Sequence, residues 1–406
     1  MEENERLRVG RIDITGNAVT DEDTIQKALT VNPGDPLRLE DLTETQSRLY
    51  DLQTFRSVDV RAEPSQNPGV SDVMVDVLEL PDVTVGYGAR YSTEDRWEVT
   101  GNVDFPNLLG DARRLDLSVF VNRNAQTYRG TYHVPYFFGL DLDTDIYVSR
   151  EIETEETFTS RGWAVTFQQG RQIREPMRVQ WSYTFRQADV EAVTAPGDPF
   201  GFDVVANRGI LSASLIHDSR NSLTNPTRGW FWNGTTQFAA TALGSDLRFV
   251  KFYGQLFYFR PVIGRGIVWA SSYRAGVAQP LGDQVLLRQD RFQAGGPNSV
   301  RGFPNDELGP TDTLLGTKIG GEGVVVLNQE LRIPVWKRFG AVVFYDAGNV
   351  YLDVKDFNPL DLRHTLGLGV RVQLPVGLAR VDWARVLNPE PADAVSRFHF
   401  SFGHAF

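Results

Sequence analysis

Alternation of apolar and polar residues with a period of two runs from Val83 to Phe406 and limits the fold of this chain more than any other feature. In the segment MRVQWSYTF, every second residue from Met177 to Phe185 is apolar, and the residues between them are polar. Successive side chains of a strand point to opposite faces, so this pattern predicts β-strands with one apolar face. No window approaches the roughly 18 consecutive apolar residues of a membrane helix. The prediction for this region is an all-β fold.

The composition of the two strand faces favours a membrane barrel. Aromatic residues make up 11% of the chain, yet the mean hydropathy is only −0.28. In a transmembrane barrel only alternate residues face lipid, so a high aromatic content is compatible with moderate hydropathy. The polar faces carry full charges, such as Arg178 and Arg186, as expected of a water-filled lumen. A soluble all-β protein, whose apolar faces would mix Val, Leu and Ile, is the alternative.

Sixteen alternating runs separated by turn signals follow one another in this region. They begin near Val83, Arg96, Arg113, Thr127, Asp141, Thr157, Met177, Val204, Gly229, Leu247, Ile267, Gly323, Phe339, Arg363, Gly377 and Ser396. An even number lets the first and last strands meet antiparallel in a closed barrel. We therefore predict a membrane all-β fold, a 16-stranded antiparallel transmembrane β-barrel over residues 81–406. If the N-terminal domain lies in the periplasm, the long gap after the eleventh strand is the sixth external loop.

The first 80 residues predict a separate α+β domain with the order β-α-α-β-β. Leu7–Thr15 alternates as a strand, and Thr20 with Asp23 predicts a capping-box start for a helix that ends at Leu29. A second amphipathic helix carries four leucines near helical spacing, and two strands close the unit. We expect residues 1–80 to form this domain. A generic α+β domain without a specific family is the alternative interpretation.

Composition also limits the chemistry and the partners. The chain has no cysteine, which excludes disulfides and thiol catalysis, and its net charge of −11 argues against a nucleic-acid partner. His217, Asp218 and Ser219 are consecutive, so a strand would splay them apart, and no hydrolase or metal-binding motif occurs. We expect no enzymatic activity, no cofactor and no metal. Met1 leads directly into an acidic segment rather than a signal peptide, so an exported protein would be a trimmed form.

Several motifs resemble those of the outer-membrane protein assembly superfamily (BamA/TamA-like). The first 80 residues resemble its small periplasmic POTRA domain, and the loop motif resembles its V/I-R-G-F/Y sequence. A terminal Phe on an alternating aromatic strand is similar to the targeting signal of outer-membrane barrels. The matching segments are Leu49–Leu52, Asn107–Gly110, His217–Trp230, the tetrapeptide Val300, Arg301, Gly302 and Phe303, and the last residue, Phe406. Together they span almost the whole chain.

The resemblance implies an outer-membrane protein assembly factor that folds and inserts β-barrel clients through a lateral seam between its first and last strands. It implies a bacterial outer-membrane location with the POTRA domain in the periplasm. The implied partners are unfolded β-barrel clients, the lipid bilayer with lipopolysaccharide, and periplasmic accessory proteins bound through POTRA. Two alternatives are a two-partner transporter that secretes an extended polypeptide and a passive porin, which would need neither the POTRA domain nor the loop motif.

Arg301 is the first candidate functional residue, because a guanidinium inside a lumen requires carboxylate partners. Glu330 shares strand parity with the polar residues Asn328 and Arg332, and Asp346 lies on a less cleanly polar face of the next strand. The resemblance implies that the motif arginine contacts acidic residues of the twelfth and thirteenth strands, and these two positions match. The alternative is that Glu330 pairs with Arg332 or with a residue of a neighbouring strand.

The seam between the first and last strands is the second candidate site. Gly86 and Gly88 pack poorly and would weaken the pairing of the first strand. The alternatives are that they relieve crowding or shape the curvature of the strand. In the last strand, four aromatic residues share one face: Phe398, Phe400, Phe402 and Phe406. We expect this seam to be the easiest place to open the barrel.

Overall fold

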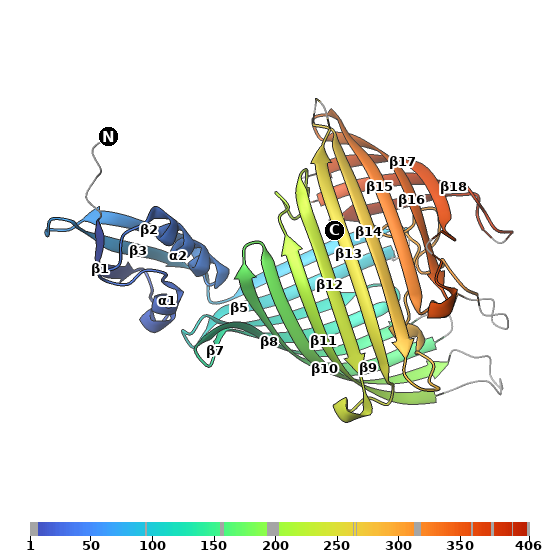
Figure 1. Cartoon of the computed structure of the whole chain (residues 1–406), viewed down its shortest axis with the longest axis horizontal. Helices are drawn as coiled ribbons and strands as arrows, with labels where there is room; N and C mark the ends of the chain where they lie inside the picture. Colours follow the sequence, from blue (N-terminus) through green and yellow to red (C-terminus); the bar gives the residue numbers. More distant parts are fainter. Residues whose placement is uncertain are drawn as a thin grey trace. The chain divides into compact units, whose positions relative to one another are not determined.

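A computed structural model describes residues 7–93, 96–154, 158–192, 203–262, 264, 266–311, 318–358, 360–374, 377–391 and 393–403. In this part of the chain a small α+β domain precedes a β-barrel (Figure 1). Neither of its two α-helices is long or apolar enough to cross a bilayer.

The N-terminal domain has the predicted β-α-α-β-β order. Its elements are β1 (Arg8–Thr15), α1 (Glu22–Ala28), α2 (Leu39–Asp51), β2 (Phe55–Pro64) and β3 (Val70–Glu79). The sheet order is β1-β3-β2, in which β1 is parallel and β2 antiparallel to the central β3. Burial of Ile25 on α1 and Leu49 on α2 with Val73 and Val75 on β3 closes one hydrophobic core.

The capping box predicted from Thr20 and Asp23 is wrong. The N-cap of α1 is Asp21, which makes no side-chain capping hydrogen bond. The Thr20 hydroxyl instead donates to Glu79 Oε1 at 2.6 Å, and the Thr20 amide donates to the same oxygen at 2.7 Å. The Thr20 hydroxyl thus acts as a donor to a carboxylate of β3, a charge-assisted hydrogen bond, and does not cap α1.

The second domain is a closed antiparallel barrel of sixteen strands, counted over the described residues (Figure 1). Each predicted strand start lies within two residues of the observed start. The strands are β4 (Thr84–Ser92), β5 (Arg96–Leu108), β6 (Arg113–Val121), β7 (Ala125–Phe137), β8 (Leu140–Thr154), β9 (Phe158–Arg174), β10 (Met177–Ala192), β11 (Asp203–Asp218), β12 (Gly229–Ala239), β13 (Phe249–Pro261), β14 (Val268–Pro280), β15 (Gly323–Trp336), β16 (Phe339–Tyr351), β17 (Arg363–Leu374), β18 (Gly377–Val386) and β19 (Ser396–Gly403).

Apolar side chains point outward along the barrel strands. Tyr87 on β4, Trp97 on β5 and Leu368 on β17 are all exposed, whereas Thr365 on β17 and Asp382 on β18 are buried. Exposed apolar residues on one face and buried polar residues on the other reverse the arrangement of a soluble protein. The outer surface therefore suits lipid, and the polar residues face the lumen.

Glu79 provides a pH-dependent contribution to the stability of the N-terminal domain. Burial raises the pKa of Glu79, but hydrogen bonds from the Thr20 hydroxyl and from the Thr20 and Val19 amides outweigh it and hold the pKa below its usual range. A lowered folded-state pKa gives stability that is present above the unfolded value of about 4.3 and is lost as the pH falls through the folded value.

We expect Glu79→Gln to lower the unfolding free energy of this domain by about 1–2 kcal/mol at pH 7, because charge-assisted hydrogen bonds are replaced by neutral ones. Hydrogen exchange of the amides in β3, measured between pH 7 and pH 3, checks this. Protection should fall toward low pH in the parent chain and vary less in the variant. Identical pH profiles for the two proteins would contradict the assignment.

Candidate functional site

The long connection between β14 and β15 folds back into the barrel. Its residues Val300, Phe303 and Leu308 are almost fully buried. They pack against residues of the barrel wall, among them Val324, Val326, Val350 and Val386. Because these wall residues come from three different strands, β15, β16 and β18, the loop lies inside the lumen rather than over the outer rim.

Arg301 lies at the centre of this contact and is 3% exposed. Its Nε and Nη2 donate to the two oxygens of Asp346 at 2.7 and 2.8 Å, which is a bidentate pair. Its Nη1 donates to Glu330 Oε1 at 2.6 Å, and its backbone amide donates to Asp346 Oδ2 at 3.1 Å. The structure therefore brings Arg301 together with both carboxylates selected from strand parity.

The charges around Arg301 form a balanced cluster. Glu330 Oε2 also accepts from Arg332 Nε at 3.1 Å, so both pairings considered for Glu330 coexist. Asp382 on β18 lies 4.0 Å from Arg301 Nη1 and accepts from Arg371 Nη1 at 2.6 Å. Three carboxylates thus face three guanidinium groups, which offsets the cost of removing them from water. In the described part of the chain, no group of three or more His, Asp or Glu side chains is placed to hold a metal ion.

The guanidinium group of Arg301 stacks on the aromatic ring of Phe344. The guanidinium carbon lies 3.4 Å from the centre of this ring, and Phe344 is 1% exposed. Stacking of a guanidinium on an aromatic face is a cation–π contact, which strengthens when water is excluded. Phe344 shares a strand face with Asp346, and its apolar side chain made that face less clearly polar in the sequence. The structure shows that Phe344 is part of the Arg301 site.

Gly302 requires its backbone freedom, because its φ is +103° and a Cβ would lie 3.2 Å from Thr365 Cγ2. Its amide donates to Nε2 of His399 at 3.0 Å. His399 belongs to β19 and is 1% exposed. The tip of the loop is therefore hydrogen-bonded to the last strand of the barrel.

Sequence reasoning missed the roles of His399 and Asp382. His399 lies on the opposite face of β19 from the aromatic residues that drew attention to this strand. Parity with Arg397 and Ser401 places it on the polar face, and this signal could have identified it. Asp382 could have been found in the same way, but nothing local in the sequence joins it to Arg301.

The seam between β4 and β19 is short in the described residues. The ladder contains two residue pairs, Ser401 with Ser92 and Phe402 with Tyr91, whereas the β18–β19 ladder contains eight. Two further bonds join Thr93 and Phe400: the Thr93 amide donates to the Phe400 carbonyl at 3.0 Å, and the Phe400 amide donates to the Thr93 hydroxyl at 3.4 Å. Over the described residues the β4–β19 ladder is therefore six pairs shorter than the β18–β19 ladder.

The glycines of β4 give space to side chains of β5. A Cβ on Gly86 would lie 2.1 Å from Asn102 Oδ1, and one on Gly88 would lie 2.7 Å from Thr100 Oγ1. Because both neighbours are ends of side chains that can rotate away, these distances agree with relief of crowding without making glycine necessary at either position. On β19, Phe398 is 66% exposed, Phe400 and Phe402 are half-buried, and Phe406 lies outside the described residues.

The barrel is closed and antiparallel, its outer surface is apolar, and buried ion pairs hold a loop in its lumen. These features define a transmembrane β-barrel with an internal loop. The chain belongs to the Omp85 superfamily, since the model of the Omp85 superfamily domain matches residues 107–406. The POTRA model, described as surface antigen variable number repeat, matches residues 7–79. The resemblance seen in the sequence motifs is confirmed. The chain is an outer-membrane barrel with its POTRA domain in the periplasm.

Curated relatives cover the chain to different extents. An outer membrane protein assembly factor BamA from Nitratidesulfovibrio vulgaris is 24% identical over 99% of this chain and 52% of its own length. The sorting and assembly machinery component 50 homolog of Homo sapiens is 26% identical over 76% of this chain and 68% of its own length. The chain thus spans about half the length of the BamA relative.

Solved structures share the fold. The crystal structure of BamA from Haemophilus ducreyi lacking POTRA domains 1–3 superposes with a TM-score of 0.83 at 19% identity, covering 98% of this chain and 84% of that one. CdiB from Acinetobacter baumannii gives a TM-score of 0.65 at 16% identity, covering 98% and 74%. Both similarities concern the architecture of a barrel preceded by POTRA.

We expect Arg301→Ala to release the loop while the barrel stays folded. Removing one partner of a buried ion pair leaves uncompensated charge and costs about 3–5 kcal/mol. Limited proteolysis of the loop in detergent micelles should then become at least tenfold faster. The matched control is Arg161→Ala, because the Arg161–Glu191 pair is largely exposed and such pairs contribute about 0–1 kcal/mol. Equal proteolysis of the parent and Arg301→Ala would contradict the role of the Arg301 contacts with Glu330 and Asp346 as a latch that holds the loop in the lumen.

Proposed function

We propose that this chain is an outer-membrane protein assembly factor that folds and inserts β-barrel clients through the seam between β4 and β19. The observation that carries the proposal is the β4–β19 ladder, which has two pairs over the described residues, whereas the β10–β11, β11–β12, β14–β15 and β18–β19 ladders have eight or more. The curated relatives named as assembly factor and sorting and assembly component support it.

The physical reason is the cost of bare backbone in lipid. An unfolded client strand cannot enter the bilayer, because each unsatisfied N–H or C=O group costs several kcal/mol there. The edges of β4 and β19, once parted, offer those hydrogen bonds to an incoming strand, as in β-augmentation. A weak ladder is therefore useful at this position, since few bonds must break before a client strand is templated.

The latched loop would keep the wall of the barrel in shape while the seam opens. Arg301 connects the loop to β15 and β16 through Glu330 and Asp346, and Gly302 connects it to β19 through His399. Strands on the C-terminal side of the seam would thus be held from inside. POTRA would deliver extended clients by edge pairing and would bind periplasmic accessory proteins. In this proposal catalysis plays no part, because strand exchange breaks no covalent bond.

Arg301→Ala is expected to lower client insertion by tenfold or more while leaving a folded, heat-modifiable barrel. The assay adds a urea-unfolded outer-membrane barrel to liposomes that contain the protein and follows the shift in its gel mobility without boiling. Undiminished insertion together with a released loop would remove the loop from the mechanism without affecting the proposed role of the seam.

Cross-linking tests the seam directly, and the absence of native cysteine makes the experiment clean. Ser92→Cys with Ser401→Cys places two thiols on paired residues of β4 and β19. We expect oxidation to abolish acceleration of client folding and reduction to restore it. The matched control joins the paired residues Ser182 and Ser212 of β10 and β11 in the same way.

Each outcome of this experiment separates the alternatives. Loss of activity in the seam variant and not in the control supports insertion through the seam. Full activity of the oxidised seam variant would exclude that route. Passage of an extended polypeptide into the vesicles, without acceleration of client folding, would assign the chain to secretion instead. Steady conductance that does not depend on the loop would assign it to a passive porin.

A further inference from the structure

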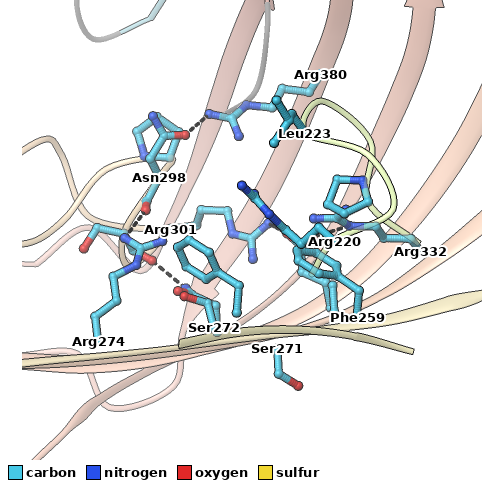
Figure 2. Close-up of a pocket in the computed structure, with 17 residues that line it drawn as sticks. Arg220, Leu223, Phe259, Ser271, Ser272, Arg274, Asn298, Arg301, Arg332 and Arg380 are labelled. Carbon is cyan, nitrogen blue, oxygen red and sulfur yellow. Dashed lines mark hydrogen bonds and ion pairs between the residues drawn. The ribbon is translucent and has the colours of Figure 1, made fainter. Parts of the chain in front are cut away.

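A cavity lies in the lumen beside the loop that carries Arg301, and several arginines contribute to its wall (Figure 2). It encloses about 650 Å³ of space between atoms, part of it continuous with solvent. Of the described residues that line it, one is acidic, Glu330, and five are arginines: Arg220, Arg274, Arg301, Arg332 and Arg380. Leu223 and Pro226 of the connection between β11 and β12 close one side.

Three of these arginines are neutralised by carboxylates. Arg301 and Arg332 share Glu330, and Arg220 forms a two-pronged pair with Asp218. Arg274 and Arg380 have no ion pair within 4.0 Å in the described part of the chain. Neither of these two guanidinium groups is therefore neutralised by a direct ion pair.

Both of these arginines hold the same residue of the loop. Arg274 Nη1 donates to the backbone carbonyl of Asn298 at 2.7 Å, and Arg380 Nη2 donates to the Asn298 side-chain oxygen. Figure 2 shows Asn298 between the two guanidinium groups, with a dashed line to each. Asn298 is neutral, so it satisfies hydrogen bonds of both groups without balancing their charge.

The cavity also contains buried polar atoms without a partner. On β14, Ser272 Oγ and Arg274 Nε make no hydrogen bond, and these residues share one face of the strand. On the neighbouring β15, Asn328 Oδ1 is an acceptor without a partner, while its Nδ2 donates to the Ser299 carbonyl at 2.6 Å. Buried polar groups are nearly always satisfied, so these atoms indicate a polar occupant.

We propose that this cavity is a binding site for a phosphate group, held between Arg274 and Arg380. The phosphate oxygens would accept hydrogen bonds from both guanidinium groups and from the Ser272 hydroxyl. The phosphate would thereby supply negative charge beside the two arginines and satisfy Ser272 Oγ and Arg274 Nε. The protonated oxygen of a hydrogen phosphate would donate to Asn328 Oδ1. The bound group would join β14 to β18 beside Asn298 and so reinforce the latch. This inference is independent of the proposed insertion activity.

The test is titration of the purified full chain in detergent micelles with inorganic phosphate, at constant ionic strength set by sodium chloride. We expect saturable binding by calorimetry and slower proteolysis of the loop when phosphate is bound. Arg274→Gln combined with Arg380→Gln should weaken binding at least tenfold. The matched control, Arg171→Gln, removes an exposed arginine of β9 that is outside the cavity and should leave the affinity unchanged.

Two further arms keep the proposal open to refutation. Asn298→Ala frees both guanidinium groups and should bind phosphate at least as tightly, which also provides a test if the double variant does not fold. A short-chain phosphatidic acid in the same micelles distinguishes a lipid phosphate from a free one, and tighter binding that still depends on Arg274 and Arg380 assigns the lipid source. Absence of saturable binding, or equal binding by the double variant, would overturn the site and leave water as its occupant.

Discussion

The buried contact between Arg301 and its carboxylates is the interaction on which the rest of the site depends. A guanidinium with 3% exposure is stable in a lumen only when its charge is balanced and its donors are satisfied. Asp346 supplies a bidentate partner and Glu330 a second one, while Phe344 supports the planar group from below. Because these partners lie on two strands, they hold Arg301 between β15 and β16, and Val300 and Phe303 on either side of the motif are buried as well.

The Arg301 loop and the seam between β4 and β19 are connected, because the loop is hydrogen-bonded to β19. The wall from β14 to β19 is paired continuously, and the loop is attached to it from inside at several strands, including β19 through His399. The ladder to β4 is the short one among the described pairings. Strain applied to the barrel would therefore concentrate at a junction with few hydrogen bonds, next to a wall that is braced. A closed barrel has no exposed strand edge. In the proposed mechanism, parting of the short β4–β19 ladder would expose the edges of these two strands.

Particular residues show how far sequence reasoning reached. Parity alone identified Glu330 and Asp346 as inward-facing, because successive side chains of a regular strand alternate between the two faces. The helix cap at Thr20 was wrong, since a carboxylate distant in sequence, Glu79, competes for the hydroxyl. His399 was overlooked for a related reason. Its partner is a backbone amide of the loop, nearly a hundred positions away, and no local pattern records such a contact.

The sequence by itself determined the alternating strands, their number and boundaries, the order of the elements in POTRA and the position of the loop with its motif. These properties follow from local chemistry, namely side-chain periodicity and turn residues, which each segment carries on its own. Only the tertiary structure decided that Asp382 and His399 join the Arg301 cluster, that the β4–β19 ladder is short over the described residues, and that Arg274 and Arg380 converge on Asn298. Those contacts depend on strand register and barrel closure, which place residues from distant strands side by side in one lumen.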